Sequence, residues 1–102
     1  MQDKTDPMIA QPSRSVQFAL VVEPPSVAQK AVRDLQEEFA MRPYCRDPEV
    51  RWDSDHARVI IRLITEGTWN LETEVRQLQE EVFEIATAVL GEFEKMRVEI
   101  ID

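Results

Sequence analysis

Apolar residues recur at alternating spacings of four and three between residues 70 and 90. This spacing follows one face of an α-helix with 3.6 residues per turn, and a strand period of two does not fit it. The stripe consists of Leu71, Val75, Leu78, Val82, Ile85 and Val89. Phe83, Ala86 and Leu90 widen it on one side, as expected for a helix that lies on a sheet. We therefore predict a long helix whose apolar face must be covered by the rest of the chain.

Alternation with a period of two predicts strands over residues 16–23, 56–65 and 95–101. A shorter strand over 49–52 precedes the turn-forming residues 53–55, which predicts a hairpin with the strand that follows. In the last strand, the even-numbered apolar residues are expected to face the core.

A second amphipathic helix is predicted over residues 27–41, where apolar positions again repeat at spacings of four and three. Ser26 follows two prolines and is expected to be the N-cap, and Pro43 is expected to end the helix. For the long helix, Asn70 is the expected N-cap and Gly91 the expected left-handed C-cap.

The resulting order, βαββαβ, predicts an α+β fold: a four-stranded antiparallel sheet of order 4-1-3-2 with both helices on one face. This arrangement resembles the ferredoxin-like superfold over residues 16–101, a resemblance of architecture that implies no particular activity. Residues 1–15 are predicted to be a flexible tail and residues 16–102 a single domain.

Composition narrows the functional classes. The 102 residues suffice for one domain, and the net charge of −8 opposes binding to phosphate backbones. The acidic residues of the long helix are expected to form a solvated face, with an acidic docking surface as the alternative. The lone Cys45 excludes an internal disulfide and fits a reducing compartment. Without a signal-peptide pattern or a span long enough for a bilayer, we expect a cytoplasmic protein with no membrane contact.

Candidate chemical residues are few. His56 lies between Asp53 and Asp55, which would suit a metal at the hairpin tip, but these are also common turn residues, and we favour that interpretation. Arg42 and Arg46 could lower the pKa of Cys45, which we nevertheless expect to be a bystander thiol. Only two residues are glycine, and neither lies in a phosphate-binding loop pattern. We therefore expect no catalytic residue, no metal and no cofactor, and hence no enzyme.

The sheet face away from the helices offers the strongest candidate surface. It is expected to carry an apolar island rimmed by arginines, formed by Val21, Arg58, Ile60, Arg62, Ile64 and Arg97. Such a surface favours a non-enzymatic interaction module, most simply a homodimer joined by sheet faces or sheet edges, or a module that binds another protein. Alternatively, Glu23, Glu66 and Glu99 pair with the arginines, whose stems then cover the aliphatic groups.

The arginines of this face also suggest two other functions. Arg58, Arg62 and Arg97 could bind a small anion or metabolite, as in ACT-type sensing domains of the same architecture, although residues 22–26 lack the Asp-x-Pro-Gly pattern of those domains. The same arginines could bind nucleic acid. The negative net charge and the absence of aromatic residues from 56–63 argue against nucleic acid.

Overall fold

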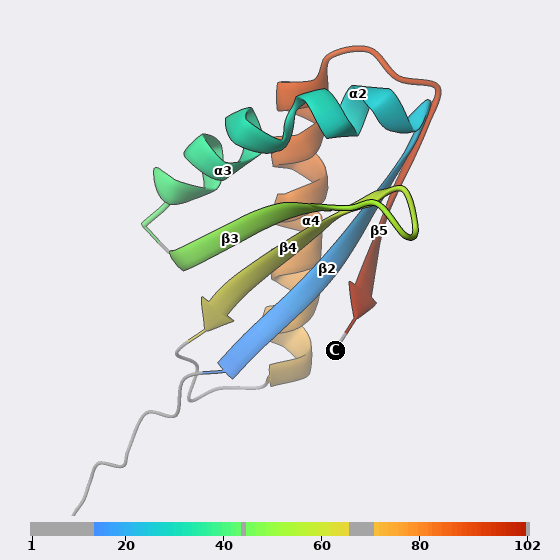
Figure 1. The fold of residues 1–102 in the computed structure, drawn as a ribbon. Coiled ribbons are helices and arrows are strands. Elements are labelled where there is room, and N and C mark those ends of the chain that lie inside the picture. The colour runs from blue at the N-terminus through green and yellow to red at the C-terminus, as the bar shows by residue number, and fades with distance from the viewer. Residues whose placement is uncertain (1–13, 44, 66–70, 102) are drawn as a thin grey trace, which may run out of the picture.

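An antiparallel sheet of four strands with helices packed against it forms the protein (Figure 1). The computed structural model describes residues 14–43, 45–65 and 71–101. The elements are β2 (Arg14–Glu23), α2 (Pro25–Lys30), α3 (Val32–Ala40), β3 (Arg46–Asp53), β4 (Arg58–Thr65), α4 (Leu71–Leu90) and β5 (Lys95–Ile101). The predicted α+β class with a four-stranded antiparallel sheet is confirmed. The predicted tail lies largely outside the described residues, although β2 begins at Arg14.

The strand order across the sheet is β3-β4-β2-β5. Numbered along the chain, the strands run 2-3-1-4 from the β3 edge and 4-1-3-2 from the β5 edge. Phe18 of β2 lies opposite Ile61 of β4 on one side and Ile100 of β5 on the other. The two central strands are thus β2 and β4, and β3 and β5 form the edges.

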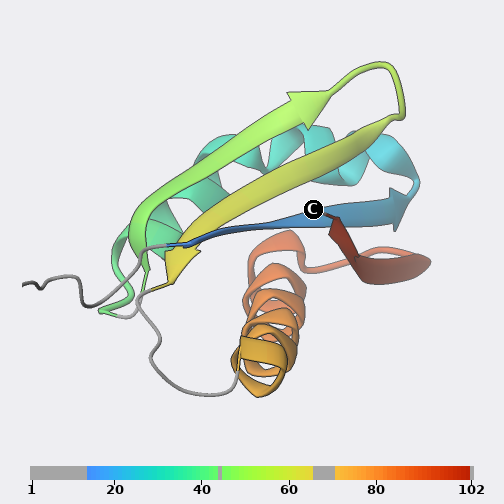
Figure 2. The ribbon, with the colours of Figure 1, turned by 90° about the horizontal axis from the view of Figure 1, so that it is seen from below.

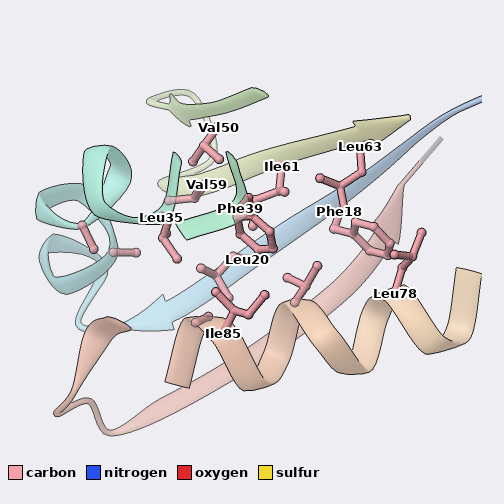
Figure 3. Packing of buried hydrophobic residues seen from close by; sticks show 14 of the residues in the cluster. Phe18, Leu20, Leu35, Phe39, Val50, Val59, Ile61, Leu63, Leu78 and Ile85 are labelled. Atoms are coloured by element: carbon pink, nitrogen blue, oxygen red, sulfur yellow. The ribbon is translucent and has the colours of Figure 1, made fainter. Parts of the chain in front are cut away.

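The core lies on one face of this sheet. Figure 3 shows Phe18 and Leu20 of β2 pointing toward Leu78 and Ile85 of α4. The same cluster receives side chains from α2 and α3, so the three helices cover a common face. In Figure 2, α4 lies beneath β2 and β5, while α2 and α3 lie behind β3 and β4. None of the described helices covers the other face of the sheet.

The apolar stripe of α4 behaves largely as its spacing predicts. Val82 and Ala86 are fully buried, and Leu78 and Ile85 nearly so. Phe83 does not belong to this buried face, because 44% of its surface is exposed. Gly91 has φ +78°, which confirms the left-handed C-cap. The predicted N-cap, Asn70, lies outside the described residues.

The first helical segment differs from the single helix predicted over 27–41. It consists of two helices separated at Ala31, whose φ of −96° and ψ of 4° leave the helical region. The Ala31 N–H donates to the Ala28 carbonyl at 3.0 Å, a tight turn that keeps both alanines buried. The first helix begins at Pro25 with Pro24 as N-cap, not with Ser26 as predicted. Proline fits this position because the first helical N–H has no intrahelical partner.

The hairpin between β3 and β4 is longer on one side than predicted. β3 begins at Arg46, because the chain accommodates a register shift between Arg46 and Glu49. Asp47 within this bulge has φ +46°. β4 begins at Arg58, after a turn in which Ala57 has φ +51°. The alternation of apolar and polar residues cannot predict an inserted residue of this kind, because the bulge itself breaks the period of two.

Candidate functional site

The residue at the centre of the open sheet face, Ile60, is buried. Ile60 lies opposite Ala19 on one side and Arg51 on the other. Although Ile60 is outside the core cluster, it is only 2% exposed. Arg58 and Arg62 lie two residues away on the same face of β4, and both are partly buried. Val21 and Ile64 are partly exposed on this face.

Carboxylates pair with the three arginines assigned to this face. Arg62 Nε donates to Glu49 Oε1 at 3.1 Å, Arg58 Nε to Asp53 Oδ2 at 3.0 Å, and Arg97 Nε to Glu99 Oε2 at 2.6 Å. Of the acids expected to pair, Glu99 does so. Arg58 and Arg62 take partners from β3, and Glu66 lies outside the described residues. A small anion must therefore compete with carboxylates of the protein for these guanidinium groups.

The carboxylate of Asp53 contacts two polar side chains at the hairpin tip. Its Oδ2 accepts the Arg58 hydrogen bond and lies 3.0 Å from His56 Nδ1. The hydrogen bond from Arg58 is the largest cause of a lowered pKa for the Asp53 carboxyl. Across the described ranges, no group of three or more His, Cys, Asp or Glu residues is arranged to hold a metal ion. The tip is thus a structural cluster around one carboxylate.

The thiol of Cys45 faces the core. Only 8% of the residue is exposed, and burial raises the pKa of the thiol to about 11. Arg42 acts in the opposite direction but is outweighed by the loss of hydration. The lowering of this pKa that Arg42 and Arg46 could cause is therefore outweighed, and the net shift is upward. At neutral pH the thiol is protonated and is a poor nucleophile.

The β3 edge of the sheet is blocked by the side-chain amide of Gln36 from α3. Gln36 Nε2 donates to the Pro48 carbonyl at 2.8 Å, and the Val50 N–H donates to Gln36 Oε1 at 2.9 Å. The amide thus makes the bonds that a neighbouring strand would make. Pro48 has no N–H, and the adjacent bulge interrupts the strand. These are devices by which proteins prevent strand addition at an edge.

The β5 edge has neither a proline nor a bulge within the described residues. All seven residues of β5 pair with β2 without a register shift, and the strand contains no proline. Gln79 of α4 donates from its Nε2 to the Val98 carbonyl of this strand at 2.8 Å. A regular strand of this kind is a template for pairing with another strand.

A groove of about 650 Å³ runs between α4 and β5. It is lined by Arg76, Gln79, Glu80, Phe83, Met96, Arg97, Val98 and Ile100. Phe83 is 44% exposed and Ile100 is 48% exposed, and both are large apolar side chains. Sequence reasoning assigned both to the core and so missed this surface. The order of the strands could have indicated this groove. It places the last strand at an edge of the sheet, where a single helix covers the strand only in part.

Comparison with known proteins finds no protein-family model that matches this chain, and no curated protein matches it. Among the described helices, none combines the length and the apolar character that a membrane span requires.

Proposed function

We propose that the protein is a small non-enzymatic interaction or regulatory module that self-associates through the part of its sheet left uncovered by helices. The observation that carries the proposal is the unequal treatment of the two sheet edges. One edge is occupied by the Gln36 amide, and the other leaves a regular seven-residue strand beside half-exposed Phe83 and Ile100. An exposed apolar groove beside the edge strand of a sheet is typical of a protein interface.

The same proposal includes a ferredoxin-like architecture for the domain. It is supported by the element order, in which α2 and α3 together occupy the place of the first helix, and by central strands that are the first and third of the chain. A place in the cytoplasm is also part of the proposal and rests on the single buried thiol.

Sedimentation equilibrium of the full chain tests self-association. A monomer has a mass of 11.9 kDa, and we expect the observed mass to approach twice this value as concentration rises. Such a rise is the mass-action signature of a reversible dimer. A mass that stays at 11.9 kDa up to about millimolar concentration, where only very weak association escapes detection, rejects the proposal.

A further inference from the structure

We infer that a second copy of the chain pairs with β5, strand against antiparallel strand, about a two-fold axis through Val98. This inference rests on the proposed function and adds the surface, the partner and the register. The two sheets then form one continuous sheet across the axis, and α4 of each copy lies under the junction. An isologous contact of this type is the commonest arrangement of homodimers.

The charges of β5 select this register. Along the strand, Lys95, Arg97 and Glu99 share the face that points away from the helices. With Val98 on the axis, residue 97 of one copy lies opposite residue 99 of the other. Arg97 then faces the partner's Glu99, and the reciprocal pair forms by symmetry. Opposite charges directly across an antiparallel pair are stabilising.

Other registers place like charges together. An axis through Arg97 pairs Lys95 with Glu99 but sets the two arginines opposite each other, and an axis through Glu99 sets two glutamates opposite each other. Shifting one β5 by a single residue along the other exchanges the two faces of that strand. Apolar side chains of one copy then lie on the same side as charged side chains of the other. A parallel arrangement in register opposes every charge to its own kind. The antiparallel register about Val98 is therefore the one that pairs Arg97 with Glu99 and sets no like charges opposite each other.

The apolar face of β5 fits the same axis. Met96 lies opposite the partner's Ile100, and the two Val98 residues meet at the centre. Ile100 is 48% exposed and Phe83, in the same groove, is 44% exposed in the free chain. Pairing would remove this apolar surface from water, which favours association. The Val98 carbonyl retains a second lone pair beside its 2.8 Å bond from Gln79, so it can accept from another strand.

Two charge-reversal variants test the register. Arg97→Glu alone, or Glu99→Arg alone, places like charges opposite each other in the symmetric dimer, and we expect the dissociation constant to rise at least about tenfold. When the two variants are mixed, positions 97 and 99 across the junction again carry opposite charges. We expect a heterodimer in the mixture, detected by native mass spectrometry and sedimentation. The ion pair within each chain stays broken in that mixture, so only the contact between chains can restore association.

Three control variants distinguish pairing at β5 from self-association through another surface. The double variant Arg97→Glu with Glu99→Arg in one chain should dimerise like the wild type, and urea midpoints show that each variant folds. Arg33→Glu changes the net charge as Arg97→Glu does, on an exposed part of α3, and should leave the dimer intact. Ile64→Lys tests the open face and should also leave it intact.

Each result decides between the proposals. A wild type that remains monomeric rejects both. A wild-type dimer that both single variants retain, or that Ile64→Lys alone dissociates, rejects pairing at β5 and leaves self-association standing. Monomeric single variants that fail to associate when mixed reject the Val98 register.

Discussion

At the scale of single residues, Asp53 connects the two strands of the hairpin to its tip. Its carboxylate accepts from Arg58 and lies against His56, and 16% of its side chain is exposed. The hydrogen bond from Arg58 lowers the pKa of the carboxyl in the folded protein. The charged form is therefore favoured by folding, so the stabilisation is present above the unfolded pKa and is lost as pH falls through the folded pKa.

We predict that Asp53→Asn lowers the urea midpoint at neutral pH and that the difference from the wild type shrinks below about pH 4, where the unfolded aspartate becomes protonated. Urea titrations at several pH values measure this difference. Asp55→Asn, an exposed neighbour at the same tip, is the control and should change the midpoint little. A difference that is the same in acid and at neutral pH would contradict the role of the Asp53 charge.

The burial of one residue and the partners of the arginines could not be predicted from the sequence. Strand alternation placed Ile60 on the face opposite the helices, and its absence from the core cluster agrees with that placement. Its burial could not be predicted, because it depends on the register that places Ala19 and Arg51 on either side of it. The partners of the arginines were likewise partly missed, since Glu49 and Asp53 reach them only through the register of β3 on β4.

At the scale of elements, the two edges of the sheet differ because two glutamines act on them differently. Gln36 binds both a carbonyl and an N–H of β3, whereas Gln79 binds one carbonyl of β5. The first arrangement satisfies a carbonyl and an N–H of β3 that another strand would need. Neither contact is visible from periodicity, which places both glutamines beside the apolar stripe of an amphipathic helix without identifying their partners.

We predict that Gln36→Ala destabilises the protein by about 1–3 kcal/mol, because the Val50 N–H and the Pro48 carbonyl both lose a partner. The free energy of unfolding in urea measures this loss. The same variant should form species larger than a dimer, since it opens a second edge, and light scattering detects them. Gln29→Ala, on the exposed side of α2, is the control. Equal behaviour of the two variants would show that the amide does not protect the edge.

Elements also differ in how well they were predicted. The long helix and the three longer strands follow from regular spacing, and their bounds agree with prediction within two residues. The break at Ala31 and the bulge before Glu49 were missed. Both arise from tertiary packing, because Ala28 and Ala31 reach the core together and Val50 is held by Gln36.

At the scale of the whole molecule, the net charge of −8 opposes the association of two copies. For charge centres about 30 Å apart, screened Coulomb repulsion is about 3 kcal/mol at 0.01 M salt and only about 0.2 kcal/mol at 0.15 M. The repulsion acts at long range, whereas the proposed ion pairs across β5 number only two and are in contact. Screening should therefore help association more than it weakens the pairs.

We predict that the dimer tightens as salt rises from about 0.01 to 0.15 M, because the repulsion between the copies is screened. Sedimentation equilibrium at several salt concentrations measures the dissociation constant. Arg33→Glu, which makes the chain more acidic away from β5, should steepen this dependence. Affinity that falls steadily with salt would indicate that local ion pairs outweigh the overall charge.

The Gln36 amide has a consequence for the size of the assemblies this chain can build. A subunit with two adhesive borders, each able to take a further strand, polymerises into fibres without limit. Here the Gln36 amide of the same subunit occupies two backbone groups of one border, so the growth of the proposed shared sheet would terminate after a single addition. A glutamine on one helix would thereby convert an aggregation hazard into a finite particle.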